Sequence, residues 1–246
     1  MDNWQIYDAL ISGVKSEDKI SFSKEGGRWS YVETQSGCGV AMSFDFDSRP
    51  PLFPGGIEGL SLSEAAEAVK SWNFKEASLG LAAINAFYNT PARMEALGCG
   101  EPYKNYCTRG LDFKGATVGL IGHLKMPEEA LKGAKQVCIL EQRPQPGDYP
   151  DPACEYLLPE CDVVLITGST LVNKTLPRLL QLCEAAYTIL VGPSVPLCPA
   201  LLKLGVNRLA GMAVVDREGA REHVVSEAEG PPYPFGQTFL LAGEPV

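Results

Sequence analysis

The sequence lacks any excess of positive charge. Its 21 Lys and Arg residues are outnumbered by 30 Asp and Glu residues, which gives a formal net charge of -9 and a pI near 4.8. Because nucleic acids are bound through clusters of Lys and Arg, this composition argues against a nucleic-acid partner. No stretch reaches the roughly 20 apolar residues of a membrane span, and no basic and then apolar leader follows Met1. We therefore expect a cytoplasmic protein without a membrane segment.

Paired cysteine motifs are also missing. The eight cysteines stand at positions 38, 99, 107, 138, 154, 161, 183 and 198, and no two of them form a C-x-x-C pair. This spacing does not resemble a structural zinc site, which takes close pairs of Cys or His ligands. Cys138 and Cys183 lie in apolar segments, where a buried and reduced thiol is expected. A metal or redox role stays open for Cys99 and Cys107, which lie in an expected linker.

Histidine is scarce, with two in the whole chain. His123 follows a glycine directly after an apolar segment, a position that suits proton transfer or metal ligation. The alternative is a histidine that bonds a loop carbonyl group. His223 lies in a charged segment, where we expect it to be solvated. The Gly-x-Ser-x-Gly elbow is absent, so a hydrolase of that type is not favoured.

The first 97 residues predict a small α+β domain. Apolar residues recur at helical spacing from Trp4 to Val14, and a meander of strands and two further helices follow. The expected bounds are 19–23, 28–33 and 39–44 for the strands, and 61–72 and 74–88 for the helices, the first of which Ser61 or Ser63 can cap. Glycine and proline interrupt residues 98–114, which predicts a linker between two domains.

Residues 115–246 alternate between strand and helix patterns. The expected strands are 117–121, 136–140, 162–167, 188–191 and 208–215, and the expected helices are 127–132, 152–158, 176–185 and 199–204. The strands are nearly continuous runs of Val, Ile and Leu, which is typical of a parallel sheet covered on both faces. The second domain is therefore expected to be Rossmann-like, and the fold class to be α/β.

Polar residues stand where these strands end, and the carboxyl ends of parallel strands meet at one rim. Gly119 and Gly122 form a reduced dinucleotide fingerprint, and Glu141 lies roughly 20 residues further on, where an acid binds ribose hydroxyl groups. The alternative is a tight turn without a ligand. His123 and Glu141 are the candidate catalytic residues, because they are expected to share this rim.

A second candidate site follows the strand that ends at Thr167. The run from Gly168 to Thr175 is similar to a phosphate loop, but Asn173 replaces its second glycine, which argues against hydrolysis of nucleoside triphosphates. A milder role is a carboxylate or phosphate held by hydroxyl and free N–H groups, with Asn173 or Thr175 as a helix cap in the alternative. The candidate ligand-binding residues are Thr167, Gly168, Ser169, Thr170 and Asn173, with Ser194 after the next strand.

Asn85 is a polar outlier on the predicted helix 74–88, where it shares a face with Asn89 four residues on. We include Asn85 among the candidate ligand-binding residues. The alternative is a surface or capping amide, because asparagine is mostly exposed in proteins.

These segments together carry a resemblance to a known family. The residues are the helical segment 79–86, the strand and turn 118–123, the run 141–150, the segment 166–175 and Gly192-Pro193-Ser194. They resemble the family called "Putative heavy-metal chelation" over most of the chain. The resemblance implies an enolase amino-terminal-like domain followed by a Rossmann-like domain, with a cleft between them for compounds related to flavins, pterins or metal chelators. It implies no particular reaction and no established catalytic residues.

Three functions fit these observations. The first is a small-molecule enzyme, a transferase or hydrolase, in which His123 and Glu141 exchange protons with an anionic ligand in the interdomain cleft, where Asp148 adds a second carboxylate. The second is a protein that binds a metal or a metal–chelator complex without turnover, although the unpaired cysteines do not favour direct capture of a soft metal. The third is an S-adenosylmethionine or nucleotide binder that uses Glu141. The metal, the cofactor and the substrate stay open, as does the assembly, for which a homodimer is one option.

Overall fold

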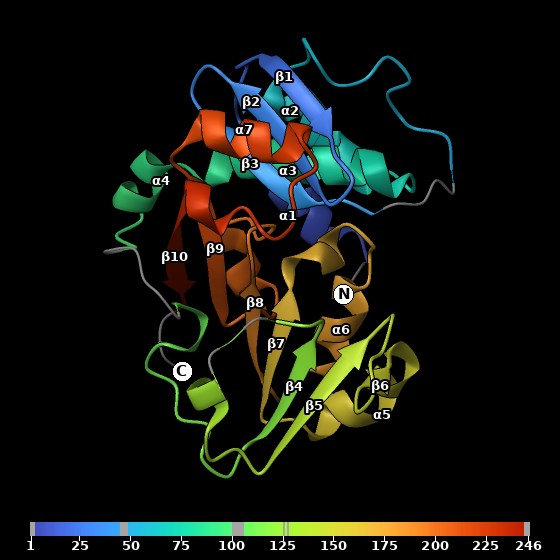
Figure 1. The fold of residues 1–246 in the computed structure, drawn as a ribbon, viewed down its shortest axis with the longest axis vertical. Coiled ribbons are helices and arrows are strands. Elements are labelled where there is room, and N and C mark those ends of the chain that lie inside the picture. Colours follow the sequence, from blue (N-terminus) through green and yellow to red (C-terminus); the bar gives the residue numbers. More distant parts are fainter. Residues whose placement is uncertain (1–2, 45–48, 100–105, 125, 127, 244–246) are drawn as a thin grey trace.

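The computed structural model of the chain describes residues 3–44, 49–99, 106–124, 126 and 128–243. Two sheets organise these residues (Figure 1). A three-stranded antiparallel sheet has the order β1-β2-β3, and a seven-stranded sheet has the order β10-β9-β8-β7-β4-β5-β6. This arrangement confirms the predicted α/β class, with a small antiparallel sheet and a larger, mostly parallel one.

The small sheet is the centre of the amino-terminal lobe. Its strands are β1 (Ile20–Glu25), β2 (Trp29–Thr34) and β3 (Cys38–Met42), and its helices are α1 (Gln5–Gly13), α2 (Leu62–Ala65), the 3-10 helix η1 (Ala66–Lys70), α3 (Phe74–Tyr88) and α4 (Pro91–Ala96). Ser61 caps α2 as predicted, in a reciprocal capping box with Glu64. The predicted helix 61–72 was wrong in its second half, because the tighter η1 follows α2. Helix α3 packs against β2 and β3.

The large sheet is the centre of the carboxyl-terminal lobe. Its strands are β4 (Thr117–Ile121), β5 (Gln136–Glu141), β6 (Tyr149–Pro150), β7 (Val163–Thr167), β8 (Tyr187–Val191), β9 (Arg208–Val214) and β10 (Gly236–Ala242). Neighbouring strands are parallel except β10, which runs antiparallel to β9. The five predicted strands of this half are therefore confirmed. Strand β6 is an addition, as is β10 beyond the last predicted element.

The helices of this half are shorter than the sequence pattern predicts. The α-helices are α5 (Cys154–Leu157), α6 (Leu176–Leu182) and α7 (Arg217–Val225), and the 3-10 helices are η2 (Tyr106–Thr108), η3 (Glu128–Leu131), η4 (Asp151–Ala153), η5 (Leu158–Glu160), η6 (Gly168–Leu171), η7 (Pro199–Lys203) and η8 (Tyr233–Phe235). The predicted helix 199–204 is the 3-10 helix η7, and the predicted helix 127–132 corresponds to η3, with residue 127 outside the described part. Proline lies in the first turn of η4, η5, η7 and η8, where its missing N–H group costs no hydrogen bond.

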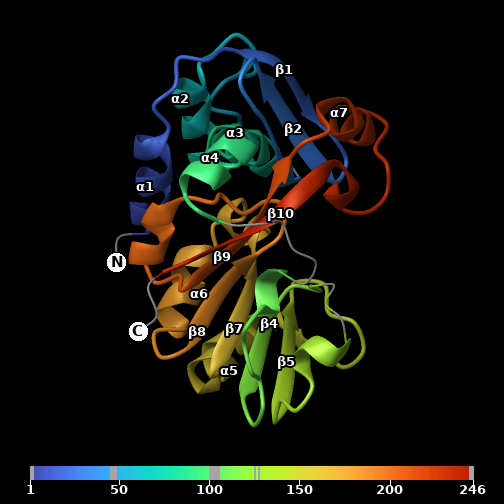
Figure 2. The same cartoon turned by 90° about the vertical axis from the view of Figure 1, so that its left-hand side faces the viewer.

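Helix α7 returns from the large sheet to the small one. It lies on the face of the small sheet opposite α3, as Figure 1 and Figure 2 both show, and it contacts β1 and β2. The Trp29 indole donates a hydrogen bond to the Gly230 carbonyl at 2.9 Å. His223 on α7 is half-buried against Phe235, and its Nε2 lies 3.1 Å from the same Gly230 oxygen, so the prediction of a solvated His223 was wrong. The domain boundary near residue 115 stays a prediction, and α7 belongs in space to the amino-terminal lobe.

One apolar core runs through both lobes. Ile6 and Ile84 of the amino-terminal lobe belong to the same buried cluster as Leu171 and Leu190 of the carboxyl-terminal lobe. The other face of the large sheet is covered by the segment around Phe113, which was expected to be only a linker. Because the lobes share a core, their relative position is held by packing. In the described part of the chain, every helix is too short or too polar to cross a membrane.

Candidate functional site

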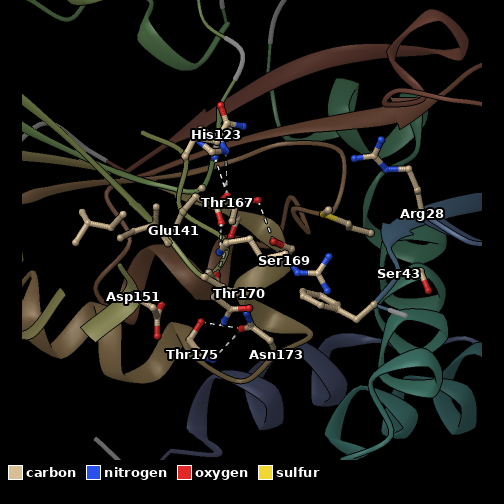
Figure 3. A pocket seen from close by; sticks show the side chains of 18 of the residues that line it. Arg28, Ser43, His123, Glu141, Asp151, Thr167, Ser169, Thr170, Asn173 and Thr175 are labelled. Atoms are coloured by element: carbon tan, nitrogen blue, oxygen red, sulfur yellow. Dashed lines mark hydrogen bonds and ion pairs between the residues drawn. The ribbon is translucent and has the colours of Figure 1, made fainter. Parts of the chain in front are cut away.

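A cavity of about 490 Å³ lies between the lobes at the carboxyl ends of β4, β5 and β7 (Figure 3). In the sheet order, β5 lies on one side of β4 and β7 on the other. The strand order therefore reverses at β4. Such switch points are where open parallel sheets bind small molecules. The lining residues are Gly27, Arg28, Met42, Ser43, Phe44, Ile121, Gly122, His123, Leu140, Glu141, Gln142, Arg143, Gln145, Asp151, Thr167, Ser169, Thr170, Asn173 and Thr175.

His123 lies between two carboxylates at this cavity. Its Nε2 is 2.7 Å from Asp148 Oδ2, and its Nδ1 is 3.5 Å from Glu141 Oε1. The backbone N–H of His123 donates to the same Glu141 oxygen at 3.1 Å. The Asp148 side chain is 7% exposed and that of His123 is 37% exposed, so the buried carboxylate holds the ring while the ring itself stays accessible. Asp148 is held in turn by the Gln145 N–H at 2.7 Å.

Local backbone chemistry brings these three side chains together. Gly122 has φ +92°, and a Cβ atom built on it would lie 3.2 Å from the Thr167 side chain. Glycine therefore allows both the turn after β4 and its close approach to β7. Strand β6 pairs with the last residues of β5, which sets the loop that carries Asp148 beside Glu141.

Hydroxyl groups from the segment after β7 line the wall of the cavity. Thr167 Oγ1 and Ser169 Oγ lie 3.1 Å apart, and the Thr170 hydroxyl donates to the Thr167 carbonyl at 2.7 Å. Asn173 Oδ1 accepts from the Thr175 N–H at 3.1 Å and from its hydroxyl at 2.7 Å. The side-chain carbonyl group of Asn173 therefore forms hydrogen bonds within the turn before α6, although Asn173 also lines the cavity.

The amino-terminal lobe supplies the opposite wall. Figure 3 shows Arg28 and Ser43 on one side of the cavity and Glu141 and Asp151 on the other. Arg28 and Arg143 are exposed arginines that line the cavity, and neither guanidinium group has a hydrogen bond or ion pair with any residue the structure describes. Two cationic groups and several hydroxyl groups suit an anionic ligand, and Arg recognises carboxylate or phosphate groups through paired N–H donors. The sequence pattern missed Arg28 and Ser43, because they reach the cavity only through the docking of the lobes.

Seven of the eleven predicted site residues line the cavity. They are His123, Glu141, Gly122, Thr167, Ser169, Thr170 and Asn173. The other four do not line it. Asn85 is buried between α3 and β3, where its Nδ2 donates to the Val40 carbonyl at 2.8 Å. Ser194 is buried at the contact between the lobes, where its hydroxyl accepts the Met42 N–H at 2.8 Å.

The two remaining glycines lie in closely packed positions. Gly119 lies inside β4, and a Cβ atom on it would approach the Leu158 and Cys161 side chains at 3.1 and 3.2 Å. A Cβ atom on Gly168 would lie 2.8 Å from the Val195 side chain. Of the two glycines of the reduced fingerprint, only Gly122 lines the cavity, and a ligand-binding role for Gly119 stays a prediction. The lysine of the phosphate-loop-like run, Lys174, does not line this cavity either.

The donor groups do not converge as a heavy-metal site requires. No group of three His, Cys, Asp or Glu side chains that could hold a metal occurs in the ranges described by the structure. The two carboxylates flank opposite nitrogens of His123, so they do not point at a common centre with the ring. Cys154, Cys161 and Cys183 are buried in the core, and burial raises the pKa of their thiols to about 12, 11 and 12. A neutral thiol is a poor metal ligand, because metals bind the thiolate.

The fold and the cavity define the class as an α/β protein of two lobes, with a cavity at a switch point of its larger sheet. Two family models match it, DUF4213 over residues 7–88 and DUF364 over residues 110–238, and both carry the description "Putative heavy-metal chelation". The chain belongs to this DUF364 family.

Two solved structures and one curated relative are similar to this chain. A DUF364 protein of unknown function from Desulfitobacterium hafniense is 38% identical, with a TM-score of 0.87 over 98% of both chains. A DUF364 protein from Pyrococcus horikoshii is 23% identical, with a TM-score of 0.79 over 99% of this chain and 100% of the other, and shows the same fold. An uncharacterized protein from Methanocaldococcus jannaschii is 32% identical over 169 residues, which are 65% of this chain and 63% of that relative.

Proposed function

We propose that the cavity binds a small organic anion, of the kind found among metal-chelating compounds, flavins and pterins, and that His123 exchanges a proton with it. The observation that carries the proposal is the placement of His123 between Asp148 and Glu141 at a cavity that is also lined by Arg28 and Arg143, whose guanidinium groups have no partner among the described residues. We propose that a metal, where one is involved, arrives as part of the ligand, since the described side chains include no group of three His, Cys, Asp or Glu that could hold it.

The geometry assigns a role to each nitrogen of His123. Asp148 as a carboxylate only accepts hydrogen bonds, so the Nε2 of His123 carries a hydrogen in the neutral and in the charged ring. The nitrogen that is free to accept a proton is then Nδ1, which lies 3.5 Å from Glu141 Oε1. An O–H or N–H group of the ligand that reaches Nδ1 from the cavity, beside Glu141, gives its proton to Nδ1. Glu141 stabilises the imidazolium ion that results.

The remaining lining residues orient the ligand. Arg28 and Arg143 bind its anionic groups from the two lobes, and the hydroxyl groups of Thr167, Ser169 and Thr170 bind its polar edge. One residue thus moves a proton while the others orient the ligand. This arrangement fits a condensation or a hydrolysis, since both reactions need a proton moved at one position of an oriented substrate.

A second candidate function is binding of a metal–chelator complex without turnover. The description of the family favours it, and the same arginines would bind the carboxylate groups of the chelator. A third candidate, an S-adenosylmethionine or nucleotide binder, has less support. In the dinucleotide fold a helix amino terminus after the first strand binds the phosphates, whereas the described residues between β4 and β5 form only the 3-10 helix η3.

The first experiment is native mass spectrometry of the purified protein with elemental analysis of the same sample. It is followed by calorimetric titration with three probes, citrate, nickel-loaded citrate and flavin mononucleotide. Binding of at least one probe that is weakened in Arg28→Ala and Arg143→Ala, but not in the exposed control Arg221→Ala, supports the proposal. Stoichiometric metal that stays bound in both cavity variants contradicts it.

Catalysis is separated from binding by His123→Asn. A retained ligand is first identified from the native sample, and its conversion is followed by mass spectrometry. An enzyme loses conversion in His123→Asn while affinity changes little. Conversion at an unchanged rate in this variant sinks the assigned role of His123, and an absence of any conversion by the wild type favours the binding protein.

A further inference from the structure

A second and smaller cavity of about 170 Å³ lies on the other side of the turn that precedes α6. Asn173 and Thr175 line the main cavity, whereas the residue between them, Lys174, lines the smaller one. The full lining set is Asn3, Trp4, Tyr7, Trp72, Lys174, Pro177 and Arg178. One turn therefore serves two cavities, and only the smaller one holds an amine.

The backbone of Lys174 has an unusual conformation. Its φ is +67°, and among the described residues only Glu227 is another non-glycine residue with positive φ. A side chain in this left-handed region costs roughly 1 kcal/mol or more, because its Cβ approaches the following carbonyl oxygen. The conformation turns the lysine away from the main cavity and toward α1. Its Nζ donates a hydrogen bond to the Val172 carbonyl at 2.7 Å, which fixes the amine at the end of its chain.

The surroundings of the Lys174 amine are aromatic. Its Nζ lies 5.5 Å from the ring centroids of both Tyr7 and Phe74. Trp4 stands against Tyr7 in an edge-to-face contact at 5.3 Å, and Trp72 stands against Trp4 in the same manner at 6.0 Å. Trp72 is 52% exposed, so the aromatic group is open to solvent on one side.

No carboxylate of the described residues pairs with Lys174. Among the described residues, Arg178 is already paired with Glu155 and Lys70 with Asp8, and the hydroxyl of Tyr7 donates to the Leu171 carbonyl. Burial lowers the pKa of Lys174 to about 7. At neutral pH about half of the molecules therefore carry a free amine, whereas an ordinary lysine with a pKa near 10.4 is almost fully protonated.

We propose that Lys174 is a nucleophilic amine that forms an imine with small aldehydes, and that the rings of Trp4, Tyr7 and Trp72 select aldehydes with a planar aromatic group. In this step Nζ attacks the carbonyl carbon, and the carbonyl oxygen takes up a proton to give a carbinolamine. The two hydrogens of the amine then leave with that oxygen as one water molecule, and a C=N bond joins Nζ to the former carbonyl carbon. No electrons are exchanged with an outside reagent, and the step reverses when water adds back.

The site is tested by trapping the imine. The wild-type protein is incubated with benzaldehyde, reduced with sodium borohydride and analysed by intact mass and peptide mapping. We expect one benzyl group on Lys174, added on the order of tenfold or more faster than on the exposed lysines of the same sample, because its amine is less protonated. The rate should rise with pH to a midpoint near 7, as the pKa of Lys174 predicts.

Two variants of Lys174 separate chemistry from folding. Lys174→Arg keeps a charge without a nucleophilic amine, and Lys174→Gly suits the left-handed backbone, so it should fold at least as well as the wild type. Both should lose the fast label. Lys70→Arg is the matched control, because the Lys70 amine lies 6.0 Å from the Trp4 ring centroid. This variant should keep the fast label. Trp72→Ala should slow the reaction with benzaldehyde more than the reaction with formaldehyde.

Three results would overturn the proposal. The first is a label spread evenly over many lysines, and the second is a fast label that persists in Lys174→Gly. The third is a rate midpoint near 10, which would show that the amine of Lys174 behaves as an ordinary lysine. An equal effect of Trp72→Ala on benzaldehyde and formaldehyde would overturn the selectivity for aromatic aldehydes.

Discussion

The two lobes meet in two different ways. At the lobe seam, defined here by Asn89, Ser194 and Tyr7 with their partners, buried polar groups are fully bonded across the contact. Asn89 donates to the Val195 and Met212 carbonyls at 2.8 and 3.1 Å and accepts the Leu197 N–H at 2.8 Å. At the main cavity, Arg28 and Arg143 are exposed and have no partner among the described residues.

This difference separates structure from function. A buried polar group costs free energy unless it is hydrogen-bonded, so the seam residues must be satisfied for the lobes to dock. An exposed arginine without a partner contributes little to the stability of the fold. Side chains that the fold does not use and that gather in one cavity are therefore available for a ligand. The predictions below test this division between the seam and the cavity.

The largest effect on stability is expected for Asn89→Ala. This change removes three hydrogen bonds across the seam and leaves two carbonyl groups and one N–H group buried without partners. We expect the free energy of unfolding to fall by about 3 kcal/mol, measured by urea denaturation. The matched control is Asn85→Ala on the same helix, which removes one bond, to Val40, and should cost about 1 kcal/mol. Equal losses for the two variants would contradict the special role of the seam.

The sequence predicted the cavity better than it predicted the seam. Strand ends can be read from apolar runs, and the carboxyl ends of parallel strands share a rim, so His123, Glu141 and the residues after Thr167 were predicted to lie together. Asn85 in α3 and Asn89 at the carboxyl-terminal cap of α3 have the same residue type and are four residues apart, so the pattern could not tell which of them bonds across the lobes. Arg28 was missed because its place depends on docking between distant segments.

Lys174 illustrates a second limit of the sequence. The phosphate-loop-like run predicted a helix after a turn, which is correct for α6. Lys174 has a left-handed φ and lines the smaller cavity, whereas Asn173 and Thr175 on either side of it line the main one. Sequence patterns carry little information about such a conformation when the residue is not glycine.

The second largest effect is a pH dependence that comes from Lys174. Its pKa of about 7 in the folded protein is below the value near 10.4 of an unfolded chain, so between these values the unfolded state binds one more proton. Stability from this group therefore rises with pH across that window, by roughly 1 kcal/mol for each pH unit, and is lowest below pH 7. Lys174→Met removes the group, so the variant should exceed the wild type in stability at pH 6.5 by more than at pH 9. A stability difference that is constant over this range would show that the amine is not desolvated.

A smaller effect is expected for Tyr7→Phe at the seam. The Tyr7 hydroxyl donates to the Leu171 carbonyl at 3.0 Å between α1 and η6. Its removal leaves that carbonyl buried and unpaired, which should lower the free energy of unfolding by about 1 kcal/mol in denaturant titrations. Tyr156→Phe is the control, because the Tyr156 side chain is 80% exposed and its loss should be undetectable. If Tyr7→Phe were as stable as the wild type, this hydrogen bond would not contribute to the docking of the lobes.

The smallest effect on stability is expected in the cavity, for His123→Asn. The ring is partly exposed, so its removal should change the free energy of unfolding by no more than about 0.5 kcal/mol. Asp148 loses its partner but keeps the Gln145 N–H, which limits the cost. The same variant should abolish proton exchange with a bound ligand, because the asparagine amide has no basic nitrogen. A large loss of stability would instead mean that His123 stabilises the fold, as Asn89 does. The main argument for a catalytic role of the cavity would then be lost.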